Sequence, residues 1–154
     1  MPPRMRLTSH DYSAPGWYFV TTVTAGRRKL FGSVTSAGVD HSPMGRLVLD
    51  EWESTLGVKK WISCAGLVLM PDHFHALVGW DAVPGNRDPS LSSLMSNFKG
   101  HSTKRLRQCG LLRSWDGVWA RGYWDHVIRD RRHFDAVQRY IEANPARAWE
   151  KARR

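Results

Sequence analysis

The segment that decides the fold is residues 65–80, AGLVLMPDHFHALVGW. Two apolar runs flank a turn at Pro71 and a short polar block. Side chains alternate along a β-strand, so His73 and His75 point to one face while Phe74 points to the other. The segment therefore predicts a β-hairpin in which two imidazoles lie side by side on one face of a half-buried strand.

The remaining sequence alternates strand and helix patterns. Ser42 can cap a helix with an apolar face, and a helix near the end of the sequence should stop before Pro145, because the residue preceding proline disfavours the α conformation. This order indicates the α+β class, an antiparallel-rich sheet with helices packed on one face. The expected strands are 16–23, 61–70, 73–80 and 117–129, the helices 42–57, 90–108 and 130–145, with a basic turn at 25–32 and a loop at 81–90.

Length and composition favour one compact domain over residues 1–154. The first ten residues lack the apolar core of a signal peptide, and no apolar run approaches the roughly 20 residues of a membrane span. Cys64 and Cys109 have no CxxC spacing and are expected to be reduced thiols. We therefore expect a cytoplasmic protein with no membrane partner.

The charge is concentrated in the last third of the chain. The net charge is +9. Residues 1–98 hold 9 Lys/Arg and 8 Asp/Glu, a balance of +1, whereas residues 99–154 hold 14 and 6, a balance of +8. A polyanion such as DNA or RNA is the natural partner for such a segment, and a solvated basic surface is the alternative.

Two imidazoles spaced as His73 and His75 can hold one divalent metal. The alternative is a pair of exposed or hydrogen-bonded histidines on a polar strand face. A histidine-triad nucleotide hydrolase would need a third histidine where Leu77 stands, so that class is excluded. A cupin-like site is excluded by the amount of expected helix.

A second group of polar residues lies in RYIEANP, residues 139–145. Tyr140 and Asn144 are four residues apart, so on a helix they lie one turn from each other on the same side, beside an apolar seam. Alternatively, Tyr140 is a core residue at the edge of the apolar seam, with its hydroxyl in contact with water, and Asn144 is a helix-end residue. With the histidines and the basic last third, the pattern favours phosphodiester chemistry, in which a metal polarises a phosphate and a phenol attacks it.

Three segments resemble one family of proteins. LVLMPDHFHALVGW resembles the HUH block (His, bulky hydrophobic, His) of single-tyrosine transposases, WDHVIRDRRHFDAVQRYIEANPARA the segment that carries their tyrosine, and WYFVTTVTAGRRKLFG their N-terminal strand and turn. The chain is most similar to the REP-associated branch, relatives of the transposase A proteins of small bacterial insertion sequences. The resemblance covers about residues 16–148.

The resemblance implies a ferredoxin-like sheet and a metal-dependent endonuclease and strand transferase that cuts single-stranded hairpin DNA through a 5′-phosphotyrosine. By position, Tyr140 would be the nucleophile, and His73, His75 and Asn144 would hold Mg²⁺ or Mn²⁺. The family often has Asn where this chain has Asp72. The resemblance also implies a bacterial protein at the nucleoid and is compatible with a homodimer.

Basic residues across the chain are the expected DNA contacts, and several aromatic residues could stack on bases. The rivals are a non-catalytic nucleic-acid-binding protein on the same scaffold and a phosphoesterase that uses water and would not need Tyr140. Expected DNA contacts are Arg27, Arg28, Lys29, Lys99, Lys104, Arg105, Arg121, Arg131 and Arg132; stacking candidates are Trp119, Tyr123 and Trp124; auxiliary candidates at the site are His126, His133 and Lys99.

Overall fold

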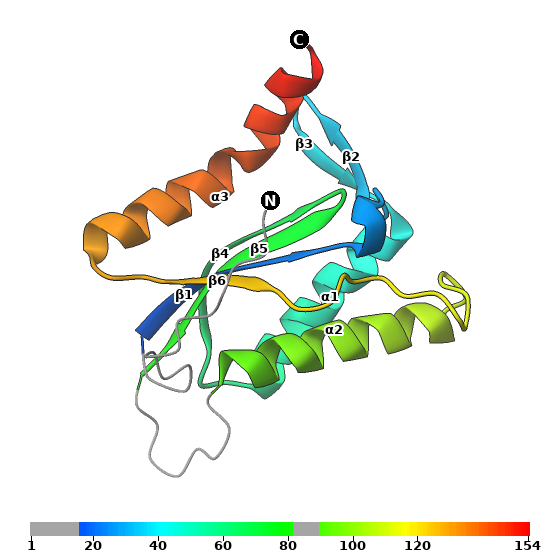
Figure 1. The fold of residues 1–154 in the computed structure, drawn as a ribbon, viewed down its shortest axis with the longest axis horizontal. Helices are drawn as coiled ribbons and strands as arrows, with labels where there is room; N and C mark the ends of the chain where they lie inside the picture. Colours follow the sequence, from blue (N-terminus) through cyan, green and yellow to red (C-terminus); the bar gives the residue numbers. More distant parts are fainter. Residues whose placement is uncertain (1–15, 82–89) are drawn as a thin grey trace.

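A four-stranded antiparallel sheet, in the order β4-β5-β1-β6, forms the centre of the protein, and a two-stranded sheet, β2-β3, lies beside it (Figure 1). The structure, a computed structural model, describes residues 16–81 and 90–154. Its elements are β1 (Gly16–Val23), the short 3₁₀ turn η1 (Ala25–Arg27), β2 (Gly32–Thr35), β3 (Gly38–His41), α1 (Pro43–Val58), β4 (Ser63–Met70), β5 (His73–Trp80), α2 (Leu91–Gln108), β6 (Trp124–Val127) and α3 (Arg131–Ala152).

The expected α+β class and ferredoxin-like sheet are confirmed. The four sheet strands and the first two helices follow the order β1-α1-β4-β5-α2-β6, with β5 and β1 in the centre, which is the split β-α-β arrangement. As expected, α1 and α2 share one face of the sheet, but α3 lies over the other (Figure 1). The second face needs this cover because β5 is buried on both sides from Phe74 to Trp80.

Alternate side chains of β1 and β5 make the core with α1 and α2. Trp52 of α1 contacts Phe74 of β5, with ring centroids 4.9 Å apart, and Phe98 of α2 at 5.0 Å. These rings bury one face of β5, so the intervening residues, including His73 and His75, must point to the other face. The core also contains Tyr18, Val20, Val48, Ala76, Val78, Leu91, Leu94 and Met95.

The helix α3 packs against a β-bulge in β4. The register between β4 and β5 shifts between Cys64 and Gly66, and Ala65 has no partner in the ladder. Gln138 of α3 donates a hydrogen bond to the free Ala65 carbonyl at 2.9 Å. One turn later the fully buried Ile141 packs over Gly66, where a Cβ would lie 3.7 Å from its Cδ1 atom. These contacts hold α3 over the histidine face of the sheet.

The expected end of the last helix before Pro145 is wrong, because α3 continues through Pro145 to Ala152. Proline removes one backbone hydrogen bond and opposes a helix interior by about 3 kcal/mol. Tertiary packing outweighs this preference: the last turns of α3 contact the β2–β3 hairpin. That hairpin was not expected, because its strands have only four residues each.

The expected strand at 117–129 is mostly wrong, since only Trp124–Val127 pairs with β1. Gly122, with φ of +77°, turns the chain ahead of it. Upstream, Val118 accepts a hydrogen bond from the Ala25 amide instead. The other strands and helices agree with expectation to within about two residues, the usual uncertainty of such boundaries.

The expected loop at 81–90 falls almost wholly on residues 82–89, which lie outside the described residues. Within the described ranges, no helix combines the length and apolar character that crossing a membrane requires.

At Gly45, α1 packs closely against the segment before β2. A Cβ at Gly45 would overlap the Phe31 carbonyl. Although alanine favours helix by up to ~1 kcal/mol, we expect Gly45→Ala to lower the free energy of unfolding by about 1–3 kcal/mol, measured by urea titration. Gly100→Ala in α2 is the matched control, since open space surrounds Gly100. It should be neutral or stabilising, and equal effects of the two substitutions would contradict the packing described.

Candidate functional site

His73 and His75 lie side by side on the α3 face of β5, as the alternation predicts. Their ring centroids are 4.7 Å apart. His75 is 6% exposed and stacks on Phe19 of β1 at 5.1 Å, while His73 at the start of the strand is half-buried. Among the residues that the structure describes, α3 is the helix that covers this pair, which therefore forms the floor of a site beneath it (Figure 1).

Tyr140 of α3 comes to the same place. Its ring lies 5.7 Å from His75 and 6.0 Å from Phe19, centroid to centroid, and the side chain is 43% exposed. Asn144, one turn on, is 8% exposed. Ala148, another turn on, lines a groove with His73. Asn144 therefore lies on the helix turn between Tyr140, which contacts His75, and Ala148, which lines the groove that includes His73, and it shares their side of α3.

Each imidazole has a partner on its Nδ1 atom. His73 Nδ1 lies 2.7 Å from an Asp72 carboxylate oxygen, and His75 Nδ1 lies 2.7 Å from Thr21 Oγ1. Arg27 donates to the other Asp72 oxygen at 3.1 Å. Because a carboxylate only accepts, the neutral His73 ring donates through Nδ1 and its Nε2 lone pair stays available. The contacts at Nδ1 thus orient both rings, as supporting residues do in metal centres.

Burial keeps both histidines neutral. It lowers the pKa of His75 to about 3, helped by the positive charges of Arg147 and Arg27 and, when it is protonated, of His73. Burial also lowers the pKa of His73, although the Asp72 carboxylate opposes it. For Asp72, burial would raise the pKa, but the hydrogen bond with His73 and the Arg27 charge hold it below its ordinary value. Neutral imidazole is the form that binds a metal.

Arg147 covers the outer face of Tyr140. Its guanidinium carbon lies 4.1 Å from the centroid of the phenol ring, and one of its nitrogens donates to the Tyr140 carbonyl at 3.1 Å. A guanidinium over a ring face is attracted by the ring quadrupole. With Phe19 meeting the ring edge-on, Arg147 holds the phenol in one orientation beside the histidines.

The residues present fit the divalent metal that the resemblance implies. Within the described residues, no hydrogen bond engages Nε2 of either histidine or the side-chain amide of Asn144. Two imidazole nitrogens and an amide oxygen can together hold one ion, with positions left for water and phosphate. No cluster of three or more His, Cys, Asp or Glu suited to a metal occurs in residues 16–81 and 90–154, so the fit depends on Asn144 as third ligand.

Two grooves adjoin the site. One, about 640 Å³ in volume, includes His73, Lys29 and Lys151. The other, about 300 Å³, lies on the far side of Tyr140 and includes His126 and His133. The two auxiliary histidines are thus close to Tyr140. Lys99, the third auxiliary candidate, instead donates to the carbonyls of Ala120 and Gly122 at 2.8 and 2.7 Å.

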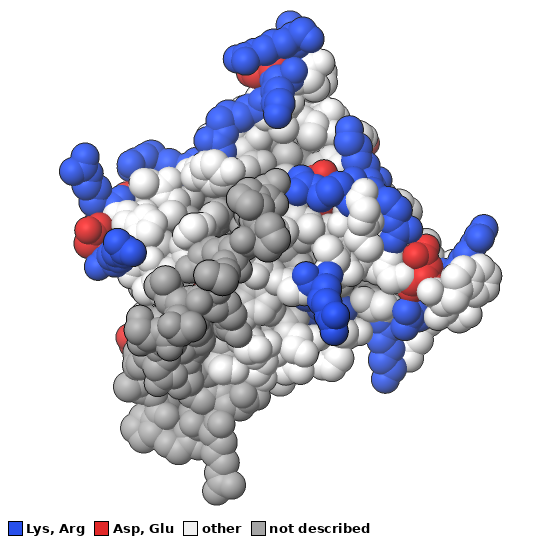
Figure 2. Space-filling model, viewed as in Figure 1, with Lys and Arg blue, Asp and Glu red and all other residues white. Residues whose placement is uncertain are grey.

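The expected DNA contacts are spread over several surfaces. Lys and Arg side chains follow α3 and surround the loop before β6 (Figure 2). Arg28 pairs with Asp116 at 3.1 Å, and Arg131 with Asp135 at 3.1 Å. Arg105 pairs with the buried Glu51 on the opposite face of the sheet from the histidines. The exposed side chains among the expected contacts are Arg27, Lys29, Lys104, Arg121, Arg131 and Arg132.

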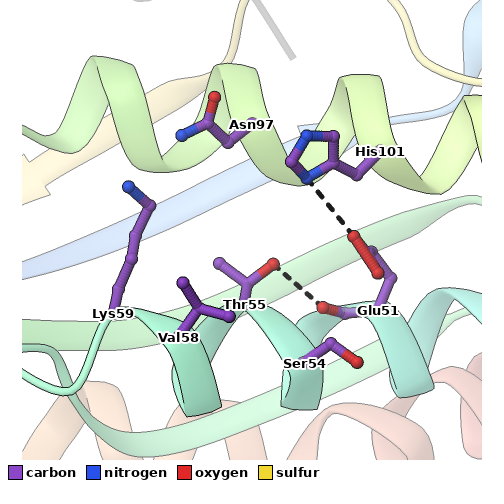
Figure 3. Close-up of a pocket in the computed structure, with 7 residues that line it drawn as sticks. All are labelled: Glu51, Ser54, Thr55, Val58, Lys59, Asn97 and His101. Atoms are coloured by element: carbon purple, nitrogen blue, oxygen red, sulfur yellow. Dashed lines mark hydrogen bonds and ion pairs between the residues drawn. The ribbon is translucent and has the colours of Figure 1, made fainter.

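Glu51 also borders a cavity of about 180 Å³ between α1 and α2 (Figure 3). His101 reaches Glu51 at 3.5 Å, and Thr55 donates to the Glu51 carbonyl at 2.9 Å. The cavity lies on the core side of the sheet, away from His73 and His75. It has no part in the chemistry of the histidine face.

Three residues at the site escaped the sequence analysis. Thr21 is found only once β1 and β5 are in register. Asp72 was noted as a departure from the family but not as a partner of His73. Arg147 lies seven residues after Tyr140, two turns along the same helix face, and that spacing was the available signal.

Burial of His75 makes the metal-free fold sensitive to acid. Its pKa is about 6.5 in the unfolded chain and about 3 in the fold, so the unfolded state binds the proton first as the pH falls. The contribution of His75 to the free energy of unfolding is at its full value above pH 6.5. It decreases toward pH 3, by up to ~1.4 kcal/mol per pH unit. Urea titrations from about pH 7.5 downward, with a chelator present, measure this slope.

His75→Asn should flatten the slope, because an amide does not gain a proton in this range. The matched control is His101→Asn, which removes an exposed histidine on the opposite face. Its slope should equal that of the wild type. A His75→Asn slope equal to that of the wild type would show that another group causes the acid sensitivity.

Known proteins are similar to this chain over most of its length. The family profile described as "Transposase IS200 like" matches residues 46–144, which is 99 of the 154 residues. An uncharacterized protein of Haemophilus influenzae is 24% identical, with 95% of this chain and 88% of that protein covered. A second protein of this organism, provisionally named a REP-associated tyrosine transposase, is 24% identical, with 89% and 74% covered.

Two solved structures share the fold. A REP-associated tyrosine transposase bound to a REP hairpin has a TM-score of 0.67 and 19% identity, with 94% of this chain and 74% of that chain covered. A Deinococcus radiodurans protein, provisionally described as a transposase, has a TM-score of 0.55 and 18% identity, with 90% and 96% covered. The family profile spans β4, β5 and most of α3, which carry the histidines and Tyr140. This chain therefore belongs to the IS200-like transposase family.

Proposed function

We propose that this protein cuts and rejoins single-stranded DNA beside a hairpin, as a single-domain HUH transposase whose nucleophile is Tyr140. One observation carries the proposal: the ring centroid of Tyr140 lies 5.7 Å from that of His75, which lies 4.7 Å from that of His73. A phenol, two neutral imidazoles and an amide meet on one sheet face. This combination suits a phosphodiester better than it suits any neutral substrate.

In the proposed step, the Tyr140 oxygen forms a bond to phosphorus while the bond from phosphorus to the 3′-oxygen breaks. The phenol loses its proton, and the departing 3′-oxygen gains one, so the products are a 5′-phosphotyrosine and a free 3′-hydroxyl. The reverse attack by a 3′-hydroxyl rejoins strands without an added energy source. This reversibility explains why a tyrosine, rather than water, would serve as the nucleophile.

A bound Mg²⁺ or Mn²⁺, held by His73, His75 and Asn144, would supply charge neutralisation at the phosphate oxygens. The other roles belong to residues of the chain itself. Asp72 and Thr21 keep the two imidazole rings in orientation through Nδ1. Arg147 and Phe19 keep the phenol ring in place, as in-line attack requires.

DNA is the proposed partner, and the positive charge of the protein supports this. The balance of +8 over residues 99–154 favours a polyanion, and the fold is shared with a transposase bound to a REP hairpin. Lys29 and Lys151 in the groove beside His73 would contact phosphates next to the cut. Action on chromosomal DNA would place the protein at the bacterial nucleoid.

Tyr140 and His75 of one chain are in contact, which supports a site completed within one chain even if the protein forms a homodimer. Mixing the chains His75→Ala and Tyr140→Phe distinguishes this from a shared site. If the site is built within one chain, the mixture should stay inactive. Recovered cleavage would show that a partner subunit provides Tyr140.

Tyr140→Phe tests the nucleophile. Hairpin DNA labelled at its 3′ end and carrying single-stranded flanks from the chromosome around this gene should give, with Mn²⁺, an adduct that survives denaturing electrophoresis. Phenylalanine keeps the ring and its contacts, so the variant should fold and bind DNA normally but form no adduct. Tyr123→Phe is the matched control and should form the adduct as the wild type does.

The outcomes separate the three function classes. Cleavage by the wild type without an adduct would favour a phosphoesterase that uses water. Tight binding without cleavage under any condition would favour a non-catalytic DNA-binding protein. An adduct formed by Tyr140→Phe would move the nucleophile to another residue.

Loss of a metal ligand tests the proposed ion separately. His75→Ala and Asn144→Ala should each weaken Mn²⁺ binding by at least about ten-fold, the lower end of the loss when a residue that supports a metal ligand is replaced, as measured by the electron paramagnetic resonance signal of free Mn²⁺. Both variants should keep DNA binding while losing cleavage. His101→Ala, on the opposite face, is the control and should bind Mn²⁺ as the wild type does. Wild-type Mn²⁺ affinity in the first two variants would contradict this ligand set.

A further inference from the structure

Trp115 is exposed to solvent in the loop between α2 and β6. Its exposed fraction is 78%, whereas Trp52 and Trp80 are buried. An indole is among the largest apolar side chains, and leaving it exposed forfeits the stabilisation that burial would bring. Trp115 is therefore a candidate for contact with a binding partner, which its surroundings have to support.

The loop that carries Trp115 is tied down on both sides. Leu112 and Val118 are buried at its two ends. Arg28 pairs with the Asp116 carboxylate at 3.1 Å and also donates to the Gly117 carbonyl. Arg107 of α2 donates to the Asp116 carbonyl at 2.7 Å. The indole is thus presented by an anchored backbone, so little conformational entropy would be lost when a partner binds it.

The surroundings of Trp115 are basic. The Arg113 guanidinium lies 5.6 Å from the Trp115 ring centroid, and Lys and Arg side chains gather around this loop (Figure 2). Asp116, the acidic residue of the loop, is already paired with Arg28. Over residues 99–121 the chain has six Lys/Arg and one Asp/Glu, a balance of +5. A fitting partner combines a flat apolar face with negative charge.

We propose that Trp115 and Arg113 form a platform on which an unpaired base of single-stranded DNA stacks. Every base has a flat π face, and its phosphates would meet the surrounding cations. Paired bases are already stacked on one another, so the platform would favour unpaired nucleotides. This inference rests on the proposed DNA substrate and adds a base-binding site distant from Tyr140 in the sequence.

The platform and the histidines are connected through one short turn. Gly26 and Arg27 both have positive φ, +66° and +55°, a left-handed conformation that is unusual for arginine. This turn sends Arg27 to Asp72, the partner of His73, and Arg28 to Asp116, beside Trp115. A strand bound to the platform would therefore contact a loop that is fixed to the same turn as the metal-site carboxylate.

The experiment compares two probes with equal charge. One is a fluorescein-labelled oligothymidylate of about sixteen nucleotides, a length within the range that single-strand sites cover; the other is the same chain without bases. The wild type should bind the first about 5- to 150-fold more tightly, the equivalent of one stacked base. Trp115→Ala should abolish this preference and leave the affinity for the base-free chain unchanged, whereas Trp115→Phe should retain most of it.

Leu111→Ala is the matched control, because Leu111 is an exposed apolar residue of the same loop and should not affect base preference. A wild-type preference in Trp115→Ala would overturn the proposal, and so would equal weakening toward both probes. If Trp115→Ala instead changes the sedimentation of the free protein, the loop contacts a second copy of the chain and the proposal is wrong. At saturating hairpin DNA, Trp115→Ala should still form the Tyr140 adduct, so failure of the platform and failure of the proposed chemistry are distinguishable.

Discussion

The antiparallel pairing of β1 with β5 places Thr21 opposite His75 and Val23 opposite His73. Side chains alternate along a strand, so a slip of one residue would turn both histidines toward α1 and α2. Such a slip would also bring Phe74 out of the core, where it contacts Trp52. The packing of one sheet face thus determines which side chains stand on the other, and the site depends on this register.

The site is electrostatically unusual because it combines neutral imidazoles with fixed positive charge. Burial removes the proton from His75, while Arg147 and Arg27 keep their charges nearby. Asp72, the carboxylate that contacts His73, is itself paired with Arg27. An approaching anion would therefore meet positive potential without competition from a free carboxylate at the histidines.

Local patterns were enough to predict much of this arrangement. The alternation around Phe74 located β5 and put both histidines on one face, and the i, i+4 spacing put Tyr140 and Asn144 on one side of a helix. Contacts between distant segments could not be read in the same way. The hydrogen bond of Thr21 needs strand register, and the passage of α3 through Pro145 needs packing against a hairpin about a hundred residues earlier in the chain.

The expected DNA contacts show the same limit. Arg28 and Arg105 were chosen for their charge, yet each is committed to a carboxylate far away in sequence, Asp116 and Glu51. Composition reveals how many cations a chain has, but ion pairing decides which of them are available to a ligand. The exposure of Trp115 also depends on contacts between segments distant in the sequence, so it could not be predicted from the neighbouring residues.

The docking of α3 onto the β-bulge has a consequence for how the protein folds. The hydrogen bond from Gln138 to Ala65 closes a loop of 73 residues, whereas β4 and β5 are joined by a tight turn. Contacts of such large sequence separation form slowly, because loop closure must precede the gain from packing. During synthesis, the histidine strand is complete long before α3 emerges. The phenol would therefore reach the histidines as one of the last events in folding, so that a partly folded chain cannot bring the two halves of the site together.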